Sequence, residues 1–347
     1  MKKSVLLSLL LFLSVSTFAQ EKSASPKVSV LMFGDYYYNI EQRDAAKKDL
    51  NGFQLRRIFF TTDFALSESF DTRFRLESEQ TANSLTPGGK LGVMVKDAFI
   101  KWKGIFKGSD FIFGLSPTPA FDVIEGAWGY RAVEKTIMDY NGVLSTRDLG
   151  VDLKGRLNEE GTVNYWVKIG NNSVNAPEAN KYKRFYGQLH LVPLKNFQLA
   201  IYGDYASNSG IRDSVENVTK NHGIVLGDLF LNYMERDKYS LGTEFFYRSE
   251  RNSFKPNASS PLQSANGMGI SVFGWVTVTD LIRLIARYDT FDPNVDKGGN
   301  SSSLLIGGVD FHINKNVSII PNIESAFYQG QSKKDVVGRI TFSYQYQ

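Results

Sequence analysis

The sequence predicts an all-β protein, a 16-stranded antiparallel transmembrane β-barrel, and three observations support this prediction. From Val28 to Gln347, segments of roughly ten residues alternate apolar and polar positions. The connections between these segments alternate between short turns and longer polar loops along the chain. The chain also begins with the pattern of a secretory signal, which is expected of a protein exported to an outer membrane.

The first residues have the three-part layout of a cleavable signal peptide. A short cationic start precedes an apolar run over residues 5–15, and small residues follow up to Ala19. We expect cleavage after Ala19, which makes residues 1–19 the signal peptide and residues 20–347 the barrel domain. The apolar run is short for a helical membrane span, which favours cleavage over the alternative of a retained anchor.

Composition narrows the classes of function. The chain has no cysteine, so it can form neither a disulfide nor a thiolate site. Its formal net charge is +4, and this value falls by two when Lys2 and Lys3 leave with the signal. So small a net charge creates no large field for nucleic acid, and the sequence contains no nucleic-acid motif. We therefore expect no nucleic-acid partner.

Strands can be placed one by one along the mature chain. They are expected near residues 28–40, 53–66, 71–80, 92–103, 110–116, 147–157, 162–170, 182–192, 197–206, 222–233, 238–248, 267–278, 281–291, 303–313, 316–327 and 335–346. Their number is even, as a closed bacterial barrel with both chain ends on one side of the membrane requires.

The connections are as informative as the strands. Short turns are expected at residues 67–69, 104–109, 158–161, 193–196, 235–237, 279–280 and 314–315. Longer polar loops are expected near 41–52, 81–91, 117–146, 171–181, 207–221, 249–266, 292–302 and 328–334. Outer-membrane barrels have short periplasmic turns and long external loops, so the N-terminus should be periplasmic after signal cleavage.

Alternation alone leaves two interpretations of the strand faces. Between residues 147 and 157, Leu149, Val151 and Leu153 alternate with charged residues. In a soluble sheet the apolar face would form a core, whereas in a membrane barrel it would face lipid. The signal pattern, the strand count and the loop asymmetry favour the barrel.

Two expected strands, 222–233 and 267–278, are apolar at both alternating positions. One explanation is a subunit contact, or a loop packed against the inner wall. The other explanation is that these are simply wide hydrophobic strands. The sequence leaves both explanations open.

The third long loop, residues 117–146, is the longest and is unusually apolar. Its apolar residues are Phe121, Val123, Ile124, Trp128, Tyr130, Val133, Ile137 and Met138. A long loop with apolar anchors must bury them, and a barrel of this size offers its lumen. We therefore expect the loop to fold inward and narrow the channel, with a short helix over residues 132–138.

The same region resembles a known family. The run FIFGLSPTPAFDV from Phe111, the stretch RAVEK around Glu134 and the strand RDLGVDLKGRL from Arg147 resemble the phosphate-selective porin O and P family. The resemblance implies a trimeric sixteen-stranded porin with an inward third loop and a lumen that passes small anions. This sequence departs from the family in its third loop, which is net acidic.

Two groups of residues are candidates for the channel. Pore-lining cations that could contact anions are Arg73, Arg75, Lys101, Lys154, Arg156, Arg283 and Arg287. Candidate residues of the constriction loop are Phe121, Glu125, Trp128, Arg131, Glu134 and Lys135. The inward-facing acids are nearly as numerous as the cations, so we expect at most a weak preference for anions.

Two arginine pairs share a strand face, Arg73 with Arg75 and Arg283 with Arg287. Each pair could present two guanidinium groups to one anionic solute. Alternatively, the arginines hold an inward loop by pairing with carboxylates such as Glu125 and Glu134.

Enzyme functions have little support in the sequence. The three histidines are far apart and show no metal-ligand spacing, and no nucleophile or nucleotide motif occurs. We therefore expect no cofactor and no metal site. The sequence predicts a porin of a Gram-negative outer membrane that conducts small hydrophilic or anionic solutes. Its partners would be outer-membrane lipid and other copies of the same chain, in a homotrimer. The alternatives are a non-conducting barrel with partner-binding external loops, or a barrel enzyme.

Overall fold

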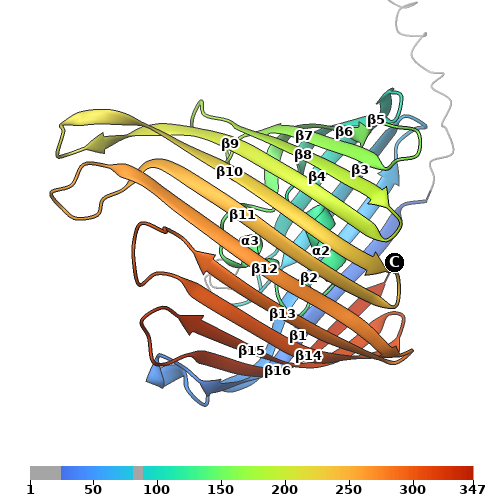
Figure 1. The fold of residues 1–347 in the computed structure, drawn as a ribbon. Coiled ribbons are helices and arrows are strands. Elements are labelled where there is room, and N and C mark those ends of the chain that lie inside the picture. The colour runs from blue at the N-terminus through green and yellow to red at the C-terminus, as the bar shows by residue number, and fades with distance from the viewer. Residues whose placement is uncertain (1–24, 81–88, 347) are drawn as a thin grey trace, which may run out of the picture.

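The computed structural model describes residues 25–80 and 89–346. The predicted signal peptide, Gln347 and part of the second long loop lie outside these residues. Within them, sixteen antiparallel strands close into one barrel, and the two short helices α2 and α3 lie within the outline of the strands (Figure 1). The predicted fold class is thus confirmed.

Each strand pairs with the next strand in sequence, and the last pairs with the first. The strands are β1 Lys27–Glu41, β2 Asn51–Ala65, β3 Phe70–Ser78, β4 Met94–Phe106, β5 Ser109–Pro117, β6 Arg147–Arg156, β7 Val163–Gly170, β8 Arg184–Leu194, β9 Phe197–Asp213, β10 Val218–Glu235, β11 Tyr239–Phe254, β12 Gln263–Thr279, β13 Ile282–Asp292, β14 Ser302–Asn314, β15 Val317–Tyr328 and β16 Asp335–Tyr346. Closure of β1 on β16 runs from Val30 opposite Tyr346 to Glu41 opposite Val336. A closed ladder leaves no sheet edge unpaired.

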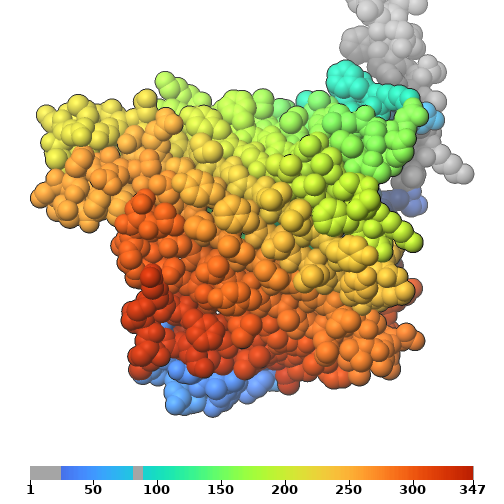
Figure 2. Space-filling view, in the orientation of Figure 1, coloured from blue at the N-terminus to red at the C-terminus, as the bar shows by residue number. Residues whose placement is uncertain are grey.

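Two predicted loops are wrong. Residues 207–221 and 249–266 were expected to be irregular, but β9 and β10 leave only four residues between them, and β11 and β12 leave eight. These strands continue as paired ribbons that project beyond the rest of the barrel wall (Figure 2). Their projecting parts are polar on both faces, which is why the apolar alternation used to place strands ended too early.

Side chains alternate between the two surfaces of the wall. On β13, Leu284 and Tyr288 are 43% and 48% exposed, whereas Arg287 and Asp289 are each 2% exposed. The exposed set points outward and the buried set points into the barrel. Within the described residues, none of the helices has the length and apolar character needed to cross a membrane.

The predicted helix over residues 132–138 is also wrong. Apart from the short 3-10 turn η1 (Ala45–Lys47), the described helices are α2 (Asp122–Trp128) and α3 (Ile137–Tyr140). Gly129 ends α2 with a φ of 70°, a conformation that glycine adopts without strain. The carbonyls of Ala132 and Val133 then accept hydrogen bonds from Arg56, so they are not used in a helix.

Candidate functional site

The third long loop packs against one side of the barrel through two apolar clusters. In the first cluster, the Trp128 side chain is fully buried, with its ring centroid 5.4 Å from that of Phe273 on β12. Its indole nitrogen donates a 2.9 Å hydrogen bond to the carbonyl of Glu134. Phe230, Ile285 and Ile306 from neighbouring strands complete this cluster, which seats α2 on the inward side of β10–β14.

The second cluster holds the two ends of the loop. Phe121, Ile137 and Met138 are buried with Tyr186 and Phe246, which are inward residues of β8 and β11. The clusters explain why the strands near residues 222–233 and 267–278 are apolar on both faces. Their outward residues are exposed on the barrel surface, and their inward residues, such as Phe230 and Phe273, pack against the loop.

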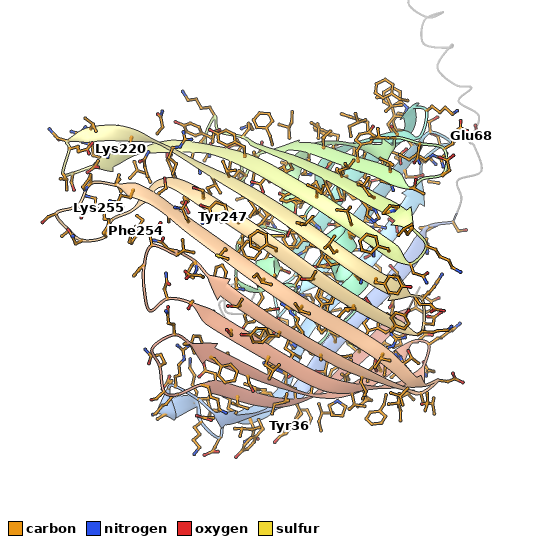
Figure 3. All side chains as sticks on the ribbon, viewed as in Figure 1. Tyr36, Glu68, Lys220, Tyr247, Phe254 and Lys255 are labelled. Atoms are coloured by element: carbon orange, nitrogen blue, oxygen red, sulfur yellow. The ribbon has the colours of Figure 1, made fainter. Side chains whose placement is uncertain are left out.

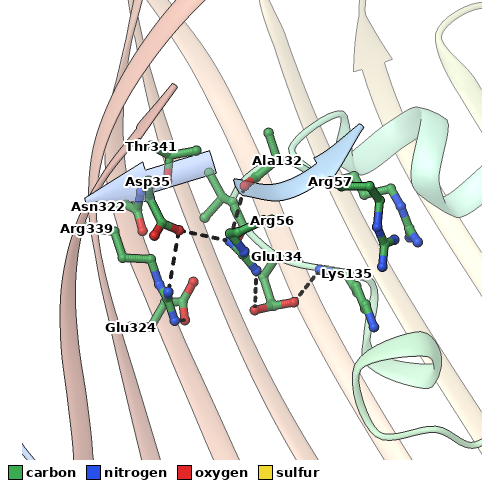
Figure 4. A network of polar contacts seen from close by, with 12 residues as sticks. Asp35, Arg56, Arg57, Ala132, Glu134, Lys135, Asn322, Glu324, Arg339 and Thr341 are labelled. Carbon is green, nitrogen blue, oxygen red and sulfur yellow. Dashed lines mark hydrogen bonds and ion pairs between the residues drawn. The ribbon is translucent and has the colours of Figure 1, made fainter. Parts of the chain in front are cut away.

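The opposite edge of the loop is held by charged groups rather than by apolar packing. Arg56 on β2 forms a 3.0 Å ion pair with Glu134 and donates a 3.2 Å hydrogen bond to the carbonyl of Ala132 (Figure 4). Asp35 on β1 lies 3.7 Å from the same guanidinium and 3.5 Å from Arg339. The loop therefore bridges the barrel from β10–β14 to β1 and β2.

A β-bulge in β2 places Arg56 where it can reach the loop. Phe33 of β1 is opposite Arg57, but the next residue, Gly34, is opposite Leu55, so Arg56 is an extra residue in β2. A bulge lets two successive side chains point to the same face. Arg56 reaches Glu134, while Arg57 forms a 2.9 Å ion pair with Glu77. Strict alternation would have placed one of these arginines on the outer surface.

A second bulge does the same on β4. Arg75 of β3 is opposite Asp97 and Leu76 is opposite Val95, so Lys96 is the extra residue. Lys96 forms a 2.8 Å ion pair with Glu77, while Asp97 lies 3.3 Å from Arg75 and also pairs with Arg147. Both bulges therefore increase the number of charges on the inward side of β2–β4.

Three cavities follow one another along β2, and the first two lie between the loop and the charged wall. One of about 340 Å³ is lined by Arg56, Arg57, Glu134 and Lys135, among others. The next, of about 230 Å³, is lined by Phe59, Thr61, Arg75, Glu125 and Arg147, among others, and the third, of about 480 Å³, by Asp63, Arg73, Lys101 and Lys154, among others. Arg131 lines both the first and the second cavity, so it lies where the two meet.

Arg131 is fixed by two acids of its own loop. Its guanidinium pairs with Glu125 and forms a 2.7 Å ion pair with Asp139. Burial raises the pKa of the Glu125 carboxyl, and the neighbouring Arg131 only partly opposes this shift. The junction of the two cavities thus contains one cation between carboxylates.

The predicted cations on β3 and β4 line the cavities but are already paired. Arg73 forms 2.7 Å and 3.0 Å hydrogen bonds with the two carboxyl oxygens of Asp63. Arg75 lies 3.3 Å from Asp97, and Lys101 lies 3.2 Å from Asp71. Each cation therefore faces the lumen as one half of an ion pair.

The remaining predicted cations lie in different surroundings. The Lys154 ammonium lies 4.0 Å from the centre of the Trp166 ring, and the Arg283 guanidinium lies 3.9 Å from that of Trp275. Arg156 is exposed at the last position of β6. Arg287 is buried, bonded to Asp289 and to the carbonyl of Lys135 beneath the loop. Arg283 and Arg287 therefore do not present two guanidinium groups to one solute.

Sequence reasoning missed four inward cations, Arg56, Arg57, Lys96 and Arg147. Three of them lie at or beside a bulge, and no repeating pattern in the sequence marks a bulge. Arg147 could have been identified from the sequence, because it begins the strand that follows the third loop. Of the two predicted loop partners, Glu134 does pair with a wall arginine, whereas Glu125 pairs within the loop.

The histidines belong to separate strands and separate polar contacts. His190 bonds Gln198 at 2.9 Å, His222 bonds Glu250 at 2.9 Å, and His312 lies 3.1 Å from Asp310. Over residues 25–80 and 89–346, no group of three or more histidine, aspartate or glutamate side chains is arranged to hold a metal ion.

Solved structures similar to this chain are outer-membrane barrels. The outer membrane channel DcaP of Acinetobacter baumannii has a TM-score of 0.67 at 11% identity, over 92% of this chain and 97% of that one. The anion-selective porin from Comamonas acidovorans has a TM-score of 0.65 at 10% identity, over 94% and 100%. OmpT of Vibrio cholerae, an outer-membrane protein, has a TM-score of 0.62 at 13% identity, over 92% of this chain and 97% of that one.

At the level of sequence, neither a protein-family model nor a curated protein matches the chain. At these identities the structural likeness establishes the fold. The chain has the sixteen-stranded barrel architecture that outer-membrane porins share.

Proposed function

We propose that the protein is an outer-membrane porin that passively conducts small hydrophilic solutes. The succession of three cavities along β2 carries this proposal. The first two lie between a loop that is fixed to the far wall and an inward surface rich in charges, and they meet at Arg131. The third continues along β2, where charged residues of β2, β3, β4 and β6 line it. Polar and charged linings keep such a path wet, so solutes can cross without a conformational change.

We infer at most a weak preference for anions. The wall residues Arg73, Arg75 and Lys101 each have a carboxylate partner within 3.3 Å. Opposite charges this close cancel at distances beyond about 10 Å in physiological salt. A solute therefore meets alternating local fields rather than one uniform field, which favours general conduction over selection of phosphate.

The proposal includes a location and an assembly. Residues 1–19 would be removed on export, and the mature N-terminus would lie in the periplasm. Exposed apolar side chains such as Phe113 (62%) and Leu241 (60%) would face outer-membrane lipid. A homotrimer is supported by the trimer form of OmpT among the similar structures. The scattered histidine contacts support a transport role rather than an enzymatic one.

Reconstitution in a planar bilayer under a salt gradient tests the proposal. We expect stepwise single-channel currents with a reversal potential close to zero, displaced slightly toward anions. A folded, heat-modifiable barrel that gives no current would support the alternative of a non-conducting, partner-binding barrel. Strong competition by phosphate would contradict the inferred lack of selectivity.

A further inference from the structure

The outer surface of β9, β10 and β11 changes from apolar to polar at one level. Tyr205 and Val225 are opposite each other and are 45% and 50% exposed. One step further along the strands, Ser207 is opposite Gly223, which is opposite Arg251. Beyond this row, the strands continue into the projecting ribbons that carry Lys220 and Lys255 (Figure 3).

The height of this level matches the border of a membrane. The stretch of β9 from Phe197 to Ser207 rises by roughly 25 Å in a tilted strand, which is also the height of the apolar band of outer-membrane barrels. The row of Ser207, Gly223 and Arg251 therefore lies where lipid headgroups meet the external solution.

A hollow lies on the barrel surface at this row. It has a volume of about 280 Å³, and its lining includes Tyr182, Tyr205, Asn221, Ser249 and Arg251. Gly223, which also lines the hollow, has no side chain to fill it. The Tyr205 side chain leans toward Gly223, with two of its atoms 3.4 Å from the place where a Cβ of residue 223 would be. The hollow thus offers hydroxyl, amide and guanidinium donors beside an aromatic ring.

Arg251 differs from the neighbouring inward arginine. Arg248 forms a 2.7 Å ion pair with Glu250. Arg251 is exposed, and among the described residues no carboxylate forms an ion pair with it. A guanidinium without an acidic partner, set among hydroxyl and amide groups, suits a phosphate group, which it can bind through two parallel hydrogen bonds.

Directly toward the membrane interior, the surface has room for an acyl chain. Gly187, Gly203 and Gly227 are adjacent on β8, β9 and β10 and face outward. A Cβ added at Gly227 would meet no atom within 4 Å. Exposed Phe185, Val225 and Tyr247 border this glycine row.

We propose that this hollow binds the phosphate-bearing headgroup of an outer-leaflet lipid, with an acyl chain of that lipid along the glycine row. The proposal rests on insertion in the outer membrane, but not on conduction. Arg251 would bind the phosphate, Tyr182 and Asn221 would contact the polar headgroup, and Tyr205 would pack against its first apolar atoms.

Native mass spectrometry of the full barrel, incubated in detergent with diphosphoryl lipid A, tests the proposal. We expect Arg251→Gln to weaken retention of the lipid by about tenfold, because a lost charged hydrogen bond corresponds to about that factor. The matched control Arg236→Gln removes an exposed arginine of a short turn at the other end of the barrel, and should retain the lipid as the unchanged protein does.

A second variant tests the acyl-chain part and does not depend on charge. Gly227→Leu places an apolar side chain on a lipid-facing surface, which the fold tolerates, and should also weaken retention of lipid A. Equal retention by Arg251→Gln and Arg236→Gln would overturn the proposal. So would full displacement of the lipid by millimolar inorganic phosphate, which would indicate a site for the free anion. Single-channel currents of the variants should stay unchanged, so a failure here is distinguishable from a failure of the porin proposal.

Discussion

The two halves of the barrel share one backbone architecture but differ in what faces the lumen. Along β10–β14, the inward residues include Phe230, Phe273 and Ile306, and the third loop covers them. Along β1–β6, the inward residues include Arg57, Arg75 and Asp97, and cavities lie in front of them. The inward positions alone therefore distinguish the strands that carry the loop from the strands that line the channel.

The two halves also hold the loop by different forces. On the apolar side, Trp128 is completely enclosed, so its contribution comes from burial and close packing. On the charged side, Arg56 forms an ion pair with Glu134, which is almost entirely buried. The attraction within such a pair is largely offset by the cost of removing both charges from water, so its net contribution to stability is smaller than that of a buried aromatic side chain.

Removal of the loop should have the largest effect. We expect deletion of residues 120–140 to raise single-channel conductance by roughly twofold or more, because a sixteen-stranded barrel without an inner segment leaves a wide aqueous channel. A matched control deletes residues 256–260 from the connection between β11 and β12 at the projecting end. An unchanged conductance in a folded, heat-modifiable deletion variant would show that the loop does not restrict the channel.

Truncation of the buried anchor should have the next largest effect. We expect Trp128→Ala to destabilise the loop by about 3 to 5 kcal/mol, the usual range for loss of a large buried aromatic side chain. Limited proteolysis within residues 117–146 and noise in the open-channel current would report it. Phe59→Ala, on the channel side of β2, is the control and should leave the loop protected. Equal protease sensitivity in both variants would contradict the difference between the halves.

Neutralising wall cations should change selectivity but not the fold. We expect Arg73→Gln combined with Arg75→Gln to shift the permeability ratio toward cations by roughly two- to threefold, because both charges lie within a Debye length of a permeating ion. The control pair Lys107→Gln and Arg236→Gln removes two charges from exposed turns. If the reversal potential of the wall variant matches that of the control, these arginines serve structure alone.

A pH titration should give the smallest effect. Burial raises the pKa of Glu125, so this carboxyl takes up a proton at a higher pH than exposed acids do. As the pH falls, the loop loses negative charge first, and the preference for anions should increase before exposed carboxyls titrate. Reversal potentials recorded from pH 7 downward check this sign. Glu125→Gln should reduce the early part of the change, and an identical titration in that variant would contradict the assignment.

Much of the fold could be predicted from the sequence because its period is local. All sixteen strands were placed within a few residues over most of their length, since outward apolar residues such as Leu284 and Tyr288 repeat at every second position. The prediction failed where this period stops carrying information. The projecting parts of β9–β12 are polar on both faces, so nothing distinguished them from loops.

The inward surface was harder to predict, because its details depend on partners that are distant in the chain. Loop residues such as Trp128 were identified from composition, but Phe273 as its contact was not. Arg56 was missed because a bulge reverses the alternation there, and that bulge is defined by the register of β2 against β1.

The class of fold, the number of strands and the apolar character of the third loop could thus be predicted from the sequence alone. These three features follow from the order of apolar and polar residues within each short segment of the chain. The side of the barrel that holds the loop and the partners of the cations became apparent only in the folded structure. Arg251, for example, has no carboxylate partner among the described residues. Ion pairs and cavities depend on distances of a few ångströms between side chains of strands that are far apart in sequence. The alternation of apolar and polar residues within one segment carries no information about those distances.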